Sequence, residues 1–220
     1  MNLKKRFTDS DLNRIKAAVN KAENTISGEI VPVIVERSGY YSIANYKGGI
    51  LGASITFFIM VLLDRYILTD AEYGLFYDPV FIFFLATVGG MIGALLPSIF
   101  SPLKRILVSR QHLDNATKQR AECAFLEEEV FNTKQRTGIM IFISFFEREV
   151  MVVADKGISK VVEQKVWDKM VTDLVTSIRN EKIVEGLEAS IMKCGEILFE
   201  NGFLKAEDDV NELSDDLRID

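Results

Sequence analysis

The sequence contains few of the residues that build common metal, redox and nucleotide sites. It has one histidine, two cysteines and four prolines in 220 residues. The cysteines, Cys123 and Cys194, form no CxxC pair, so they indicate neither a zinc site nor a disulfide framework, and we expect both to be core thiols. One histidine, His112, cannot build the usual zinc site alone. Walker, GxGxxG and HExxH motifs are absent, so the sequence predicts no nucleotide cofactor and none of the best-marked protease activities.

Basic residues are also in the minority. There are 26 Lys and Arg against 32 Asp and Glu, a formal net charge of −6. This balance argues against a nucleic-acid partner, which would require a basic face to meet phosphates. The excess of acid is local, because residues 205–220 contain seven acids and two basic residues. We expect this segment to be a flexible or docking acidic tail that anionic lipid headgroups would repel.

Apolar residues are concentrated in two long uncharged runs. Residues 48–63 contain 16 residues without a charge and residues 79–103 contain 25. As a helix, the stretch 80–100 would be about 31 Å long, one hydrocarbon thickness. Two buried helices of a large globular core are the alternative, but a stretch with no polar face leaves no side for solvent. The sequence therefore predicts a transmembrane hairpin with spans 48–68 and 80–100.

The distribution of basic residues predicts the orientation of this hairpin. The connecting stretch 64–78 has one basic residue, whereas the flanks within about 20 residues of the spans carry seven. We therefore expect both termini in the cytoplasm, the short acidic loop outside, and the protein in the cell (inner) membrane. Residues 1–20 contain no apolar signal-peptide core that would contradict this orientation. Each span also has a GxxxG pair compatible with close helix packing: Gly48 with Gly52, and Gly89 with Gly93.

The flanking segments, 1–47 and 104–204, predict one small α/β domain that the hairpin interrupts. Thr8 is a good N-cap for a helix whose apolar residues recur as far as Ile26. An apolar strand follows over residues 29–35, in which Pro32 lacks an N–H and should lie at an edge or a bulge.

The second segment predicts a β-hairpin between helices. Apolar runs at 139–145 and 150–154 are joined by a short charged turn. A helix over 113–131 precedes them, a helix capped by Ser159 with Trp167 on its buried face follows, and a helix over 183–198 comes last. This order indicates a sheet covered by helices.

Short motifs in these two segments resemble the TPM domain family in their order. They lie at residues 25–33, 136–139, 147–150, 154–158 and 166–167. The ending at 208–215 is similar to that of a bacterial branch that carries a membrane hairpin. The family includes thylakoid-lumen photosystem II repair proteins and an acetylcholine-receptor modulator.

This resemblance implies a TPM-like α/β/α sandwich interrupted by a two-helix transmembrane hairpin. For some relatives it also implies acid phosphatase activity and bound calcium, although not every member is an enzyme. Bacterial relatives are often encoded beside LemA-like helical membrane proteins, so the resemblance implies such a protein as a partner.

Three residues are the candidates for chemistry. Asp155 follows an apolar strand and precedes a helix start, a position where open α/β sheets place ligands. Glu29 begins the other strand and matches the family's glutamate, so the two carboxylates are candidate ligands for Ca²⁺ or Mg²⁺, with further oxygen ligands needed. Arg136, with Thr137 and Gly138 after it, is suited to holding an oxyanion. The structural alternative is that Asp155 caps a helix and Glu29 pairs with Arg136.

Two functions are compatible with these features. The first is a membrane-anchored protein whose cytoplasmic domain assists or regulates a membrane protein complex. The second is a metal-assisted phosphatase in which Glu29 and Asp155 bind the metal ion and Arg136 binds the phosphate. The first is favoured because no complete nucleophile–base constellation can be identified.

Overall fold

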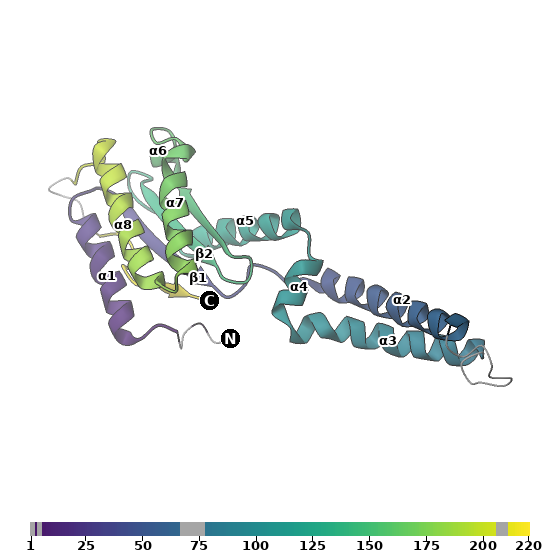
Figure 1. Ribbon diagram of the computed structural model, residues 1–220. Coiled ribbons are helices and arrows are strands. Elements are labelled where there is room, and N and C mark those ends of the chain that lie inside the picture. The colour runs from purple at the N-terminus through teal and green to yellow at the C-terminus, as the bar shows by residue number, and fades with distance from the viewer. Residues whose placement is uncertain (1–2, 4–5, 67–77, 206–210) are drawn as a thin grey trace. The chain divides into compact units, whose positions relative to one another are not determined.

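The computed structural model describes residue 3 and residues 6–66, 78–205 and 211–220 (Figure 1). In chain order its elements are α1 (Asp9–Glu23), β1 (Glu29–Val35), α2 (Ser42–Tyr66), α3 (Pro79–Ile99), α4 (Ser101–Leu107), α5 (Arg110–Glu127), β2 (Gly138–Ser144), β3 (Glu149–Ala154), α6 (Lys156–Ser159), α7 (Gln164–Arg179), α8 (Ile183–Glu200) and β4 (Arg218–Ile219).

The chain divides into two compact units. One consists of residues 1–38 and 114–220 and is called the domain below; the other, residues 39–113, is called the hairpin unit. The hairpin unit is inserted between β1 and β2, between the first and second strands. It extends about ten residues beyond the expected limits at each end, because α2 begins before the first uncharged run and α4 packs against both α2 and α3.

The domain contains one four-stranded sheet in the order β3-β2-β1-β4. β1 and β2 are parallel, with Glu29 opposite Gly138, and β3 is antiparallel to β2. The fourth strand comes from the acidic segment and pairs in parallel with β1 at Val33 and Ile34. This strand was not predicted. Pro32 lies on the part of β1 whose outer side β4 does not reach, which suits a residue without an N–H.

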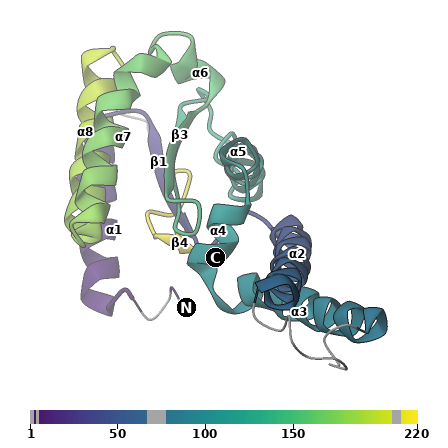
Figure 2. The same cartoon turned by 45° about the vertical axis from the view of Figure 1, so that its right-hand side comes forward.

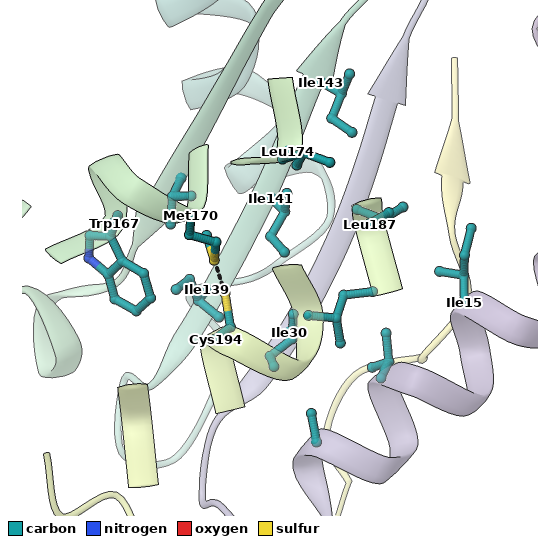
Figure 3. Close-up of a cluster of buried hydrophobic side chains, with 14 of the residues drawn as sticks. Ile15, Ile30, Ile139, Ile141, Ile143, Trp167, Met170, Leu174, Leu187 and Cys194 are labelled. Carbon is teal, nitrogen blue, oxygen red and sulfur yellow. Dashed lines mark hydrogen bonds between the residues drawn. The ribbon is translucent and has the colours of Figure 1, made fainter. Parts of the chain in front are cut away.

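Helices cover both faces of this sheet (Figure 2). Alternate side chains of β1 point to opposite faces, so Ile30 and Ile34 join the core beneath α1, α7 and α8, while Val31 and Val33 join a smaller core beneath α5. Figure 3 shows the larger core, in which Trp167 lies beside Met170 and Cys194. The α/β/α sandwich expected from the sequence is confirmed.

Several helix boundaries in the domain differ from the prediction: α5, expected over 113–131, spans Arg110–Glu127. α1 begins after the Thr8 cap as expected but ends at Glu23, and Ile26 instead forms an isolated bridge with Leu204. Ser159 caps no helix: it ends the four-residue helix α6, and α7 starts at Gln164. The reason is that Asp155 already caps α6, so the helical chain breaks once before α7 begins.

In the hairpin unit, α2 and α3 pack through small residues. A Cβ atom on Gly48 would collide with the carbonyl oxygen of Gly93, and one on Gly52 with the carbonyl oxygen of Gly89. The two GxxxG pairs therefore face each other within one chain, which lets the two backbones approach closely.

Candidate functional site

Arg136 and Asp155 form an ion pair at one end of the strands, where β3 ends and β2 begins. Arg136 Nε lies 2.6 Å from Asp155 Oδ2, and its Nη2 donates to Oδ1 at 3.0 Å. Oδ1 also accepts the N–H of Lys156 at 2.6 Å and so caps α6. The Asp155 side chain is 4% exposed, whereas that of Arg136 is 52% exposed. The buried Asp155 carboxylate is therefore bound in a bidentate manner by the solvent-exposed Arg136 guanidinium.

The backbone around Arg136 is shaped to hold this pair. Arg136 adopts a left-handed conformation with φ of 57°, which costs about 1–2 kcal/mol for a residue with a Cβ. Its guanidinium lies 5.7 Å from the ring centroid of Phe131, and its carbonyl oxygen accepts the N–H of Gly157 at 2.9 Å. The hydrogen bond with Asp155 raises the pKa of Arg136, so the guanidinium stays charged.

Thr137 and Gly138, which follow Arg136, have structural roles. The Thr137 hydroxyl is buried and donates to the carbonyl oxygen of Ser27 at 2.7 Å. A Cβ on Gly138 would collide with the carbonyl oxygen of Val130. Gly138 therefore permits a close backbone approach, but to Val130 rather than to a ligand.

Glu29 lies at the same end of the strands but has different partners. Gly138 on β2 lies opposite Glu29 on β1, and the Gly138 carbonyl oxygen accepts the N–H of Asp155, which follows β3. The Glu29 carboxylate nevertheless accepts the backbone N–H groups of Glu212 at 3.0 Å and Leu213 at 3.4 Å. The alternative that Glu29 pairs with Arg136 is therefore wrong, because Arg136 is bonded to Asp155.

The direction of β3 determines which strand ends lie beside Asp155. Asp155 does follow the carboxyl end of a strand, as the sequence indicated. Because β3 is antiparallel to β2, that end lies beside the amino ends of β1 and β2. The ligand-binding rule for open parallel sheets refers to the carboxyl ends, so it does not support a site at Asp155.

Whether this end of the strands suits a metal ion depends on which carboxylate oxygens are available as ligands. Both oxygens of Asp155 and both oxygens of Glu29 accept hydrogen bonds from the protein. Among the described residues, no group of three or more His, Cys, Asp and Glu side chains is placed to hold a metal ion. A role for Glu29 and Asp155 as Ca²⁺ or Mg²⁺ ligands stays a prediction, and no reaction step through such an ion follows from this arrangement.

A cluster of buried acids lies beside Glu29 and was not foreseen. Glu23 Oε1 accepts the N–H of Ile30 at 2.7 Å, while Oε2 is buried with no hydrogen-bond partner in the described part of the chain. Burial raises the pKa of Glu23 to about 8, and the neighbouring Glu29 and Asp215 carboxylates add to the shift while Lys205 opposes it. Burial also raises the pKa of Glu29. We call Glu23, Glu29 and Asp215 the tail cluster; no sequence motif marks it, because Asp215 lies 186 positions after Glu29 in the sequence.

The acidic tail closes over this cluster and is part of the domain. The Asp220 N–H donates to Ile34 O at 3.0 Å, and the Glu36 N–H donates to Asp220 O at 3.1 Å, so the chain end extends the sheet. Three ion pairs fix the tail to the domain: Lys16 with Asp216, Arg120 with Asp220, and Arg218 with Glu128. The flexible alternative is therefore wrong for residues 211–220; residues 206–210 lie outside the described residues.

At the opposite end of the strands, the charged turn between β2 and β3 contains a buried carboxylate. Glu147 is 0% exposed, accepts the N–H of Ser38 at 3.0 Å and accepts the hydroxyl of Ser144. Ser38 Oγ in turn donates to Ser144 Oγ at 2.8 Å. Arg148 takes the left-handed conformation that the turn needs, with φ of 58°. The turn was predicted, but the burial of Glu147 was not.

An apolar hollow of about 290 Å³ lies elsewhere on the domain. Residues of α1 and α8 line it, together with Thr25, which follows α1: Ala22, Thr25, Met192, Gly195, Glu196, Phe199 and Glu200. The predicted site residues do not line it.

The cysteines and the histidine have ordinary environments. Cys194 is buried, its Sγ lies 3.5 Å from Met170 Sδ, and burial raises the pKa of its thiol. Cys123 is exposed, so the expectation of a core thiol is wrong for this residue. His112 packs edge-on against Tyr41 at 5.9 Å between ring centroids.

Comparison with known proteins accounts for this architecture. A sequence profile described as TPM domain matches residues 105–197. The chain contains a TPM domain. The chain is also similar to the NMR structure of the BA42 protein from the psychrophilic bacterium Bizionia argentinensis, with a TM-score of 0.59 and 18% identity over 97% of this chain and 95% of that one. A search of curated proteins gives no match.

Proposed function

We propose that this protein anchors its TPM domain to a membrane through α2 and α3, and that the domain assists or regulates a membrane protein complex from the cytoplasmic side. The observation that carries the proposal is the pair of apolar helices whose side chains remain outside the fold. Residues 42–63 and 79–99 have mean hydropathies of 1.7 and 2.2, and only 11% and 6% of their most apolar windows are buried.

The energetic argument follows from the exposed side chains. Large apolar residues are exposed along both helices: Ile50, Ile55, Phe57 and Phe58 on α2, and Phe83, Phe84, Met91, Ile92 and Leu95 on α3. Burying such a side chain away from water is worth about 1.5–3 kcal/mol. A lipid bilayer removes this exposure without requiring any further protein, and α3 at about 31 Å matches its hydrocarbon thickness.

Extraction and labelling test the anchor and its orientation. We expect the full chain to stay with the membrane pellet after alkaline carbonate washing; release into the supernatant would overturn the anchor. For orientation, a cysteine is placed at Asp70, which lies outside the described residues, in a Cys123→Ser background. Cys194 is buried and should not react. Labelling of D70C from the cytoplasmic side alone would overturn the orientation.

The partner and the phosphatase activity remain separate predictions. The TPM resemblance suggests a LemA-like membrane protein as partner, and isolation of the two as one complex after co-expression tests this. The metal-assisted phosphatase requires Arg136 to leave Asp155 for a phosphate, because the two side chains now neutralise each other.

A further inference from the structure

The two lateral edges of the sheet differ in how they are covered. On the outer side of β1, β4 pairs with Val33 and Ile34. The Glu23 carboxylate accepts the Ile30 N–H there, and Pro32 has no N–H that needs an acceptor. β3 forms the other edge, because it is the outermost strand and pairs with β2 alone. Every residue of β1 and β2 is buried, whereas five of the six residues of β3 are only partly buried, so this edge is the more accessible one.

Half of the backbone groups of β3 point away from β2. In an antiparallel pair, residues that exchange hydrogen bonds alternate with residues that do not. The Asp155 N–H donates to the carbonyl oxygen of Gly138, which the register places opposite it, so every second residue back from Asp155 bonds to β2. The residues between them direct their N–H and C=O groups to the outer edge: Val150, Val152 and Ala154. No hydrogen bond joins these outward groups to any residue that the structure describes.

This edge lacks the features that usually prevent strand addition. Proteins protect an exposed edge with proline, lysine, a bulge or a very short strand. β3 is about 20 Å long, its register with β2 has no interruption, and residues 150–154 contain neither proline nor a charge. Val150 and Ala154 pack against the larger core, while Met151 and Val153 pack against the smaller one. An added apolar strand would therefore extend both cores.

A cation lies at each end of this edge. Arg148 immediately precedes β3 and Lys156 follows it after Asp155; both are exposed, and neither side chain makes an ion pair with a described residue. Asp155 is bound by Arg136, and the acids on either side of Arg148 are buried or partly buried. The two cations therefore complement a strand with acidic ends.

The same two cations disfavour a second copy of this chain at the edge. An antiparallel pair of β3 strands that joins all the outward groups would place Val152 opposite Val152 of the other copy. Arg148 would then lie opposite Lys156 of that copy, and like charges directly opposite each other are destabilising.

We propose that the outer edge of β3 binds an extended apolar segment of a partner protein, about five residues long with an acid at each end, which adds to the sheet as a further strand. In this mode the main-chain hydrogen bonds supply affinity and the alternate side chains supply specificity. The inference rests on the proposed action of the domain on another protein and adds how that protein is held. It does not depend on the membrane anchor.

A labelled peptide tests this on the purified full chain in non-ionic detergent. The probe is fluorescein-labelled Asp-Val-Ala-Val-Ala-Val-Glu, and fluorescence anisotropy gives its affinity. We expect saturable binding with a Kd below about 1 mM. The same peptide N-methylated at its five central residues keeps the side chains but loses the N–H donors, so it should not bind. Partition into detergent micelles would persist with the methylated peptide and is recognised in this way.

Two variants of the chain test the edge itself. Val152→Pro removes the outward N–H at the centre of the edge and leaves the bonds to β2 in place, so it should weaken binding at least about tenfold. The matched Val152→Ala shortens the same side chain but keeps the N–H, and should bind as the wild type does. Arg148→Gln/Lys156→Gln should weaken binding of the acid-ended peptide by roughly 2–20-fold, and should not affect a peptide that ends in Asn and Gln.

Each outcome decides for or against strand addition. No binding at about 1 mM peptide, or equal binding of the plain and methylated peptides, would overturn the inference, and both results come from the wild-type chain even if Val152→Pro fails to fold. A full-chain dimer that Val152→Pro converts to a monomer would also overturn it, because a second copy would then occupy the edge. Carbonate-resistant protein that binds no peptide keeps the membrane anchor and loses this inference alone.

Discussion

Replacing Glu23 with Gln should stabilise the domain at neutral pH. Glu23 is 7% exposed, and one of its oxygens has no hydrogen-bond partner among the described residues. A glutamine keeps the oxygen that accepts the Ile30 N–H and replaces a group whose ionised form burial disfavours. Its amide N–H₂ would also face the Glu29 and Asp215 carboxylates that oppose ionisation of Glu23.

The magnitude follows from the pKa of Glu23. Burial raises this pKa from 4.5 to about 8, so between those values the folded chain binds more protons at Glu23 than the unfolded chain does. The free energy of unfolding therefore falls as pH rises: the contribution is fully present below pH 4.5 and is lost as pH rises through 8. At pH 7 Glu23 is ionised in the unfolded chain but still mostly protonated in the folded chain, which favours unfolding by about 3 kcal/mol. A glutamine cannot ionise in either state, so it removes this penalty.

Tryptophan fluorescence provides a selective assay. Trp167 is the single tryptophan, and it is buried in the domain core, so urea unfolding of the full chain in mild detergent reports this domain alone. Measured from pH 5 to 8, Glu23→Gln should differ from wild type by about 3 kcal/mol at pH 7 and by little at pH 5. Glu122→Gln, an exposed acid on α5, is the control and should show no such trend.

Two results would refute this reasoning. A stability difference that is the same at pH 5 and pH 8 would mean that Glu23 does not change its protonation on folding. A destabilised Glu23→Gln variant at pH 7 would mean that the ionised carboxylate has a cation partner. Glu23→Ala also cannot ionise but leaves the Ile30 N–H without its acceptor, so it should be less stable than Glu23→Gln by about 1–3 kcal/mol at every pH.

Four further predictions concern other parts of the chain. Gly52→Ala should separate the two spans of the hairpin, measured as a longer spin-label distance, while Gly49→Ala, whose nearest atoms lie 3.3 Å away, should change it less. Gly138→Ala should lower the free energy of unfolding by about 1–3 kcal/mol in the fluorescence assay, through its clash with the backbone. Deleting residues 211–220 should lower the free energy of unfolding by at least about 2 kcal/mol, because the Glu29 carboxylate loses its two backbone N–H donors. An unchanged urea midpoint would contradict this role of the tail. A phosphatase should hydrolyse p-nitrophenyl phosphate with Ca²⁺ or Mg²⁺ and lose turnover in Asp155→Ala; turnover kept at the full rate would exclude the predicted mechanism.

The strands that the sequence identified are those with a strong local pattern. β1 is apolar on both faces, and its seven residues were predicted with the bounds that the structure has. The β2–β3 hairpin was also predicted, although its turn lacks Gly and Asn. Arg148 instead supplies the left-handed conformation. β4 has only two residues and forms through contacts with a strand about 185 positions earlier, so no local pattern marks it.

The candidate site shows a similar division. Asp155 and Arg136 were both identified as residues with a role, but their pairing depends on β3 running antiparallel to β2, and strand order and direction are properties of the assembled sheet. Glu23 was only one polar residue at a helix end. The returning tail places Asp215 close enough to influence its ionisation, and the acidity of that tail suggested solvation instead.

β1 links these features along its length. At its amino end, Ile30 bonds to the carboxylate of Glu23, and near its carboxyl end Ile34 and Glu36 bond to Asp220. Two residues later, Ser38 bonds to Glu147 and the chain enters the hairpin unit. Ionisation at one end of β1 and release of the tail at the other would thus act on the same strand that leads to the proposed membrane anchor. A tail that was merely flexible would have no such connection, whereas this tail supplies both a strand beside β1 and the N–H donors for Glu29, and the raised pKa of Glu23 should make the stability of the domain depend on pH.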